Sequence, residues 1–135
     1  MSGRPGPPTR WKLVVLESPY AAATQEEFDK NKAFARACLR DCLSRNESPI
    51  ASHLLLTQQG VLDDNDPDQR KVGIGAGHAW TAVADAVVVY TDLGISAGMR
   101  AGITVAEAHR KEIIYRVLNG DHRRSVRDKK TPASD

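Results

Sequence analysis

The sequence predicts an α/β domain in which a small parallel β-sheet of four or five strands is covered by helices on both faces. Short apolar runs rich in β-branched residues alternate with longer segments of helical periodicity. The segments follow the order strand, helix, strand, helix, strand, helix, strand, which is typical of right-handed crossovers between parallel strands. The run at 85–90 (DAVVVY) is apolar almost throughout, as expected for a strand buried on both faces.

The first strand and the first helix have clear boundaries. Residues 11–16 (WKLVVL) are a short apolar run that ends at the turn-forming residues 18–20 (SPY). Thr24, with Glu27 three residues later, is typical of a capping box and predicts the start of a helix. Apolar residues then recur at helical spacing, and the helix is expected to end near Asn46.

The middle of the chain is less regular. Residues 49–52 (PIAS) predict a second short strand, whereas residues 54–62 fit neither the helical nor the strand period. An acidic loop follows. Asp66 before Pro67 is a good N-cap and first helical residue, so a helix is expected from there to about Val83.

The last third supplies the strand at 85–90, a loop at 91–95 and one more helix and strand. Ser96 is a suitable N-cap for a helix that runs to about His109, and residues 112–118 (EIIYRVL) predict the final strand. Together the elements predict a flavodoxin-like or Rossmann-like three-layer sandwich.

Composition limits the class of protein. With 135 residues, 41% of them hydrophobic, the chain has material for one core. We expect a disordered arm at 1–10, one domain at 11–118 and a basic polar tail at 119–135. The domain itself is slightly acidic, which argues against a nucleic-acid-binding face apart from weak contacts of the tail. Neither a membrane span nor a signal peptide is visible, so we expect a cytoplasmic protein.

Three patterns that resemble metal or cofactor motifs do not meet the requirements of those motifs. Cys38 and Cys42 share one face of the predicted helix and are expected to be small buried hydrophobes. The glycines of 73–77 (GIGAG) do not follow a strand, so close packing of a helix on the sheet explains them better than a dinucleotide site does. The acidic run 64–68 lacks the glycine and glutamate of a calcium loop. We therefore predict no metal and no cofactor.

The fold places a ligand site beyond the carboxyl ends of the strands, where helix N-termini favour anions. The loops at those ends are 18–24, the segment that begins at 52, and 91–99. Their hydroxyls, imidazole, carboxylate and glycines suit a sugar or a phosphorylated sugar. The alternative is that the serines only end turns and that the histidine only packs. The residues concerned are Ser18, Tyr20, Thr24, Ser52, His53, Thr91, Asp92, Gly94, Ser96 and Gly98.

Three segments together resemble a known family. They are 14–20 (VVLESPY) with the helix at 31–43, then 51–80, which holds SHL and P-x-x-R-x-x-G, and finally 83–106, which holds D-x-x-x-V-Y and ISAGMRAGI. The pattern resembles small phage and bacterial domains related to nucleoside 2-deoxyribosyltransferases and nucleotide N-glycosidases. The resemblance covers about residues 12–118 and implies a flavodoxin-like sheet that binds a nucleoside or nucleotide.

The resemblance also implies roles for residues. Those on the sugar or base would be Ser18, Pro19 and Tyr20, with Ser52 and His53 after the second strand. Ser96, Gly98 and Met99 would line a phosphate or sugar pocket, and Arg70 would face it from a loop. The family's nucleophilic glutamate in the last motif falls on Gly102, and a second family carboxylate falls on Gly77. Glycine can neither attack an anomeric carbon nor stabilise its positive charge.

Two functions follow as hypotheses. The first is cleavage or exchange of an N-glycosidic bond, with Asp92 or Asp85 assisting the oxocarbenium ion and with Tyr20 or His53 placing water or the base. The second is a non-catalytic protein that senses or sequesters a nucleotide, which the missing glutamate favours. A structural or adaptor protein that has lost the pocket is the third alternative. Family members commonly form dimers or larger assemblies, so we expect a homo-oligomer with residues 54–62 as its interface.

Overall fold

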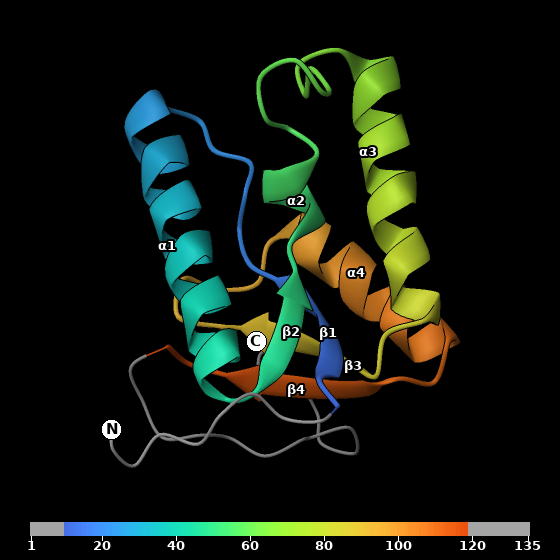
Figure 1. Cartoon of the computed structure of the whole chain (residues 1–135). Coiled ribbons are helices and arrows are strands. Elements are labelled where there is room, and N and C mark those ends of the chain that lie inside the picture. The colour runs from blue at the N-terminus through green and yellow to red at the C-terminus, as the bar shows by residue number, and fades with distance from the viewer. Residues whose placement is uncertain (1–9, 119–135) are drawn as a thin grey trace.

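The computed structural model describes residues 10–118, and the domain is built around one parallel sheet of four strands (Figure 1). The strand order is β2-β1-β3-β4. The predicted arm and tail lie outside the described residues, except for Arg10. The strands are β1 (Lys12–Glu17), β2 (Glu47–Ile50), β3 (Ala86–Tyr90) and β4 (Glu112–Arg116).

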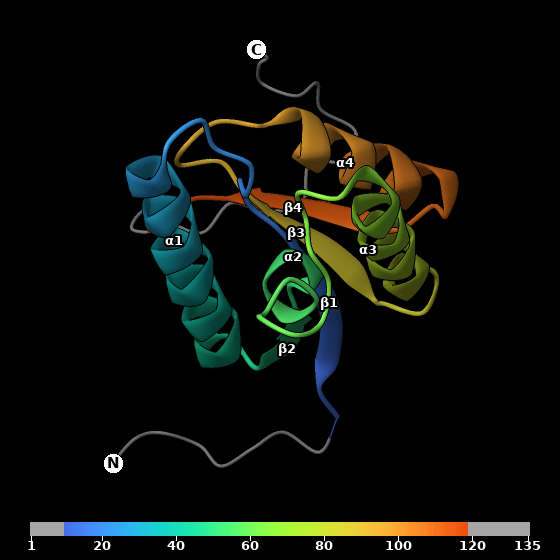
Figure 2. The same cartoon turned by 90° about the horizontal axis from the view of Figure 1, so that it is seen from above.

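Helices cover both faces of the sheet, which confirms the predicted three-layer class. Figure 2 shows α1 (Gln25–Ser44) on one side of the sheet and α4 (Ala97–Ala108) on the other. In Figure 1, α2 (Ser52–Leu55) stands above the arrowhead of β2, and α3 (Pro67–Ala79) descends on the right of the view towards the start of β3. The segment that connects α3 to β3 begins with a short 3₁₀ helix, η1 (Trp80–Ala82).

The core is divided by the sheet into two apolar clusters, because alternate strand residues face opposite sides. On the α1 side, Val14 and Leu16 of β1 pack with Cys38 and Cys42, and both thiols are fully buried and free. The prediction of two buried, unlinked cysteines is confirmed. On the α4 side, Val15 packs with residues of β3 and of α4. This alternation directs the side chain of Glu17 to the α4 side.

The predicted helix starts are confirmed by their caps. The side chains of Thr24, Asp66 and Ser96 each accept a hydrogen bond from an N–H in the first turn of α1, α3 and α4. Glu27 does reach back, but it accepts from the backbone N–H of Ala23, one residue before the cap. The N-termini that face the sheet's carboxyl edge are therefore fixed by local sequence.

Several element boundaries differ from the sequence-based prediction. The second strand begins at Glu47, earlier than predicted, because Glu47 pairs with Lys12 in the register of β1. Ser52 belongs to α2 instead of the strand, and the unassigned segment 54–62 is the end of that one-turn helix followed by turns. Helix α3 ends at Ala79, and the 3₁₀ turn carries the chain on to Val83.

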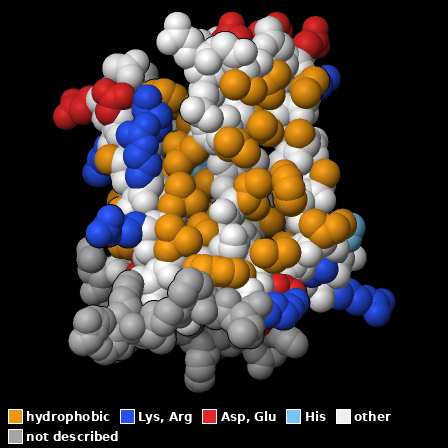
Figure 3. All heavy atoms as spheres, in the orientation of Figure 1, with side chains coloured by type: hydrophobic (Ala, Val, Ile, Leu, Met, Phe, Trp, Pro, Cys, Tyr) orange, Lys and Arg blue, Asp and Glu red, His pale blue; other side chains and the backbone are white. Residues whose placement is uncertain are grey.

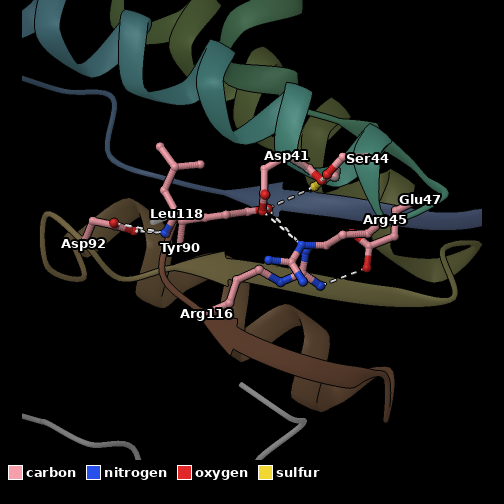
Figure 4. A network of polar contacts seen from close by, with 9 residues as sticks. Asp41, Ser44, Arg45, Glu47, Tyr90, Asp92, Arg116 and Leu118 are labelled. Carbon is pink, nitrogen blue, oxygen red and sulfur yellow. Dashed lines mark hydrogen bonds and ion pairs between the residues drawn. The ribbon is translucent and has the colours of Figure 1, made fainter. Parts of the chain in front are cut away.

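A buried polar network ties α1 to three strands (Figure 4). The guanidinium of Arg116 donates two hydrogen bonds, of 2.9 and 2.8 Å, to the carboxylate of Glu47, and both side chains are less than one-tenth exposed. It also donates to the hydroxyl of Tyr90, which in turn donates to Asp41 at 2.7 Å. Burial alone would lower the pKa of Arg116, but these bonds raise it above its usual value, so the group stays charged.

Apolar side chains gather on the face that β2, α2 and α3 present in Figure 3. Exposed large hydrophobic residues of α2, of the following turn and of α3 are Leu55, Val61, Val72 and Ile74. The homo-oligomer with an interface at residues 54–62 stays a prediction. No helix within residues 10–118 is long and apolar enough to span a bilayer.

Candidate functional site

A cavity of about 240 Å³ opens where β1 ends and where α2, α3 and α4 meet. This is the carboxyl edge of the sheet, at which the sequence predicts a ligand site. Eight of the eleven predicted binding residues line the cavity, and they come from four segments that are distant in sequence. They are Ser18, Tyr20, Ser52, His53, Arg70, Ser96, Gly98 and Met99.

One wall of the cavity is formed by Ser18, His53 and Tyr20. The Ser18 hydroxyl lies 2.9 Å from Nε2 of His53, and the Tyr20 ring meets the imidazole edge-on with centroids 5.8 Å apart. Burial lowers the pKa of His53 to about 4, so the imidazole is neutral at neutral pH. A neutral imidazole held by a hydroxyl can exchange hydrogen bonds with a polar ligand without adding charge to the site.

The opposite wall is formed by α3 and the loop before it. Arg70 lines the cavity, where it is paired with Asp64 at 2.9 Å. His78, in the last turn of the same helix, also lines the cavity. The site therefore includes one guanidinium, but that guanidinium is already partly neutralised by a carboxylate.

The first turn of α4 closes the cavity at its third side. Ser96 caps this helix by accepting from the backbone N–H of Met99, and the Met99 sulfur accepts from the N–H of Ser96. Gly94, in the loop before it, has a φ of 91°, which a residue with a side chain rarely adopts. The helix N-terminus is thus presented to the cavity, where its dipole favours an electron-rich ligand atom.

Three residues that the sequence assigns to the site, Pro19, Asp85 and Asp92, do not line the cavity. Asp85 precedes β3 at the opposite edge of the sheet and accepts from the backbone N–H of Leu13 at 2.7 Å. Asp92 accepts from the backbone N–H of Leu118 through both carboxylate oxygens (Figure 4). Pro19 is buried outside the cavity lining. The carboxylates of both aspartates therefore accept hydrogen bonds from backbone N–H groups outside the cavity. The hypothesis that they assist an oxocarbenium ion loses its geometric basis.

Glu17 is the site residue that the sequence reasoning missed. It is the last residue of β1, it lines the cavity, and its side chain points toward α4. Burial raises its pKa from 4.5 to about 8. The available signal was a single carboxylate at the carboxyl end of an otherwise apolar strand, directly before Ser18. A carboxyl group with a raised pKa in a cleft is a common feature of functional sites.

Gly102 and Gly77, which the resemblance places at carboxylate positions, both make room for side chains of the cavity lining. A β-carbon added at Gly102 of α4 would overlap the carboxylate of Glu17. A β-carbon added at Gly77 of α3 would overlap the hydroxyl of Ser52 and lie 2.9 Å from its Cβ. The predicted close packing of the 73–77 glycines on the sheet is corrected here, because the close approach at Gly77 is to α2.

We expect Gly77→Ala to lower the free energy of unfolding by about 1–3 kcal/mol. The Ser52 hydroxyl can rotate away from the new methyl group, but its Cβ cannot, so α2 and α3 must move apart. Gly75→Ala is the matched control in the same helix. Nothing lies within 4 Å of its added Cβ, so the better helix propensity should raise stability by up to about 1 kcal/mol. Urea unfolding measures both, and equal shifts in the two variants would contradict this packing.

Within residues 10–118, no group of three or more His, Cys, Asp or Glu side chains is arranged to hold a metal ion. Asp64 and Asp66, which belong to the acidic run considered as a calcium loop, pair with Arg70 and cap α3. The polar atoms that face the cavity are therefore those of the hydroxyls, the imidazoles, Arg70 with its partner Asp64, and Glu17.

The sheet order and the flanking helices define a three-layer α/β domain, and solved structures share this fold. A 2-deoxyribosyltransferase from the psychrotolerant bacterium Bacillus psychrosaccharolyticus matches with a TM-score of 0.56 and 14% identity over 81% of this chain and 74% of that chain. A CMP N-glycosidase of Clostridium botulinum, BcmB, matches with a TM-score of 0.44 and 18% identity over 77% and 67% of the two chains.

The chain belongs to the family described as Domain of unknown function (DUF7768), whose model matches residues 12–116. The match covers the domain from the first strand to the last. No curated protein matches the sequence.

Proposed function

We propose that the cavity binds a nucleoside or a nucleotide and that the domain cleaves or exchanges its N-glycosidic bond. The observation that carries the proposal is one cavity that is lined both by the carboxyl group of Glu17 and by the hydrogen-bonded pair of Ser18 and His53. The fold shared with a 2-deoxyribosyltransferase, an enzyme that acts on such bonds, supports this choice of substrate. A glycosyl group needs hydrogen-bond partners for its hydroxyls and a carboxyl group near its anomeric carbon.

The mixed lining of the cavity suits the two halves of a nucleoside. Apolar atoms of Val15, Leu16 and Ile74 lie beside the polar groups, and the aromatic ring of Tyr20 forms part of the wall. A planar base can pack on such a surface while the sugar hydroxyls meet Ser18 and His53. The N-terminus of α4 is the place that favours a phosphate or a ring oxygen.

The experiment is an incubation of concentrated protein with a panel of ribonucleosides, deoxyribonucleosides and their monophosphates, followed by ultrafiltration and chromatography of the filtrate. Free base, or a sugar phosphate, is expected for at least one member of the panel. Ala97→Trp, which places a large side chain in the lining, should abolish the reaction. Ala101→Trp is the control, since Ala101 is exposed on the same helix and does not line the cavity.

A second function is favoured by the absence of a carboxylate at Gly102 and Gly77. It is a binding protein that senses or sequesters a nucleotide without changing it. The same experiment separates the two functions, because such a protein removes one compound from the filtrate and returns it intact after denaturation. A panel that is neither bound nor cleaved would contradict both functions.

A further inference from the structure

The side chain of Glu17 takes up the space that a side chain at position 102 would need. The carboxylate reaches from the end of β1 to the backbone of α4 at Gly102, a fully buried position in the second turn of the helix. Any residue larger than glycine at 102 would displace it. The glycine is therefore a condition for the placement of this carboxyl group, and the pair Glu17 and Gly102 forms one feature of the site.

The carboxyl group of Glu17 makes no polar interaction that stabilises the described part of the fold. No hydrogen bond or ion pair joins it to any of residues 10–118, whereas Asp85 and Asp92 each hold backbone N–H groups and Asp64 holds Arg70. Even so, the group lines the cavity and is partly withdrawn from water. A carboxyl group without a structural partner, kept in a cavity at a cost in solvation, is typical of a group that acts on a ligand.

We propose that Glu17 is the proton donor of the reaction, a role that rests on the proposed function and deepens it. The neutral acid gives its proton to the leaving base as the C–N bond breaks. The bonding electrons go to the base, and positive charge develops on the anomeric carbon and the ring oxygen. Water then adds to the anomeric carbon and returns a proton to the Glu17 carboxylate. The products are the neutral free base, which carries the transferred proton on its nitrogen, and the free sugar.

The environment of Glu17 supports the donor role over a nucleophilic one. Its raised pKa keeps the group largely protonated at neutral pH, and a protonated carboxyl group can donate but cannot attack. The nearest strand neighbours on its face are apolar, since Val15 shares that face and Val89 is its partner in β3. The titratable groups that share the cavity with it are Tyr20, His53, Asp64, Arg70 and His78.

The test compares two leaving groups in Glu17→Gln, a variant of equal size that cannot donate a carboxyl proton. On the nucleoside that the wild type cleaves best, kcat/KM should fall by about 10²–10⁴-fold. On para-nitrophenyl riboside, whose leaving group departs without protonation, the loss should stay below about tenfold. The wild-type rate on the nucleoside should decline above pH 8, while the rate on the nitrophenyl compound should not.

Gly102→Ala tests the placement of the carboxyl group without changing Glu17. The new methyl group displaces the carboxylate, so the variant should show the same selective loss on the nucleoside. Gly75→Ala, in open space on α3, should leave both rates unchanged. The donor role alone would be overturned if Glu17→Gln cleaved the nucleoside as fast as the wild type does. It would also be overturned if kcat/KM fell equally on the two substrates. A wild type that cleaves no compound would overturn the proposed cleavage as well.

Discussion

Replacing Glu47 with glutamine is expected to lower the free energy of unfolding by about 3–5 kcal/mol, the largest effect on stability that we predict. The carboxylate of Glu47 is the counter-charge of Arg116, and both side chains are less than one-tenth exposed. A guanidinium does not lose its proton in proteins, so the charge that remains stays buried without a partner. Urea unfolding followed by circular dichroism measures the loss.

Two comparisons separate the buried charge from the packing. The double variant Glu47→Leu with Arg116→Met removes both charges and should recover most of the stability lost in Glu47→Gln. Glu112→Gln breaks the ion pair between Glu112 and Lys12, two side chains that are each 39% exposed. It should lower the free energy of unfolding by less than about 1 kcal/mol. If Glu47→Gln loses no more unfolding free energy than Glu112→Gln, the polar network around Arg116 does not stabilise the sheet.

The fold follows from the sequence because its determinants are local. The capping side chains of Thr24, Asp66 and Ser96 mark helix starts within a few residues, and the apolar run at β3 marks a strand buried on both faces. The start of β2 was placed too late because Glu47 is polar. Its charge is compensated by Arg116, 69 residues away, and no local pattern contains that partner.

The cavity lies at the edge of the sheet where the sequence predicts a site, but Glu17 lines it and the predicted carboxylates Asp85 and Asp92 do not. The sequence points to Asp85 and Asp92 because they are the carboxylates that remain where the resemblance places glycines, yet each accepts a hydrogen bond from a backbone N–H that the sequence does not reveal. The sequence does not single out Glu17, because a residue that ends a strand carries no periodic signal of its own. Its significance depends on Gly102, and only the packing of α4 on the sheet brings these two positions together.

The same packing predicts that the protein loses stability as the pH rises from 6.5 to 8. In the unfolded chain the carboxyl group of Glu17 has a pKa of 4.5, whereas burial raises it to about 8 in the folded protein. The folded state therefore holds a proton that the unfolded state has released. Under this condition the free energy of unfolding falls with pH, by at most about 1.4 kcal/mol per pH unit.

The choice of pH window matters because His53 acts in the opposite direction. Its pKa falls from 6.5 to about 4 on folding, so between these values the unfolded state binds the extra proton and stability rises with pH. Between pH 4.5 and pH 6.5 the contributions of Glu17 and His53 oppose each other. Above pH 6.5 the imidazole of His53 becomes increasingly neutral in the unfolded state as well, so the contribution of Glu17 dominates.

Glu17→Gln is expected to abolish the fall between pH 6.5 and 8, because the amide does not titrate. Near pH 8 the variant should also be more stable than the wild type, since folding no longer places a carboxylate in the cavity. Chemical denaturation of both proteins across this window measures the difference. Parallel stability curves would mean that the Glu17 carboxyl group remains hydrated in the folded protein, and the physical basis for its proton-donor role would then be lost.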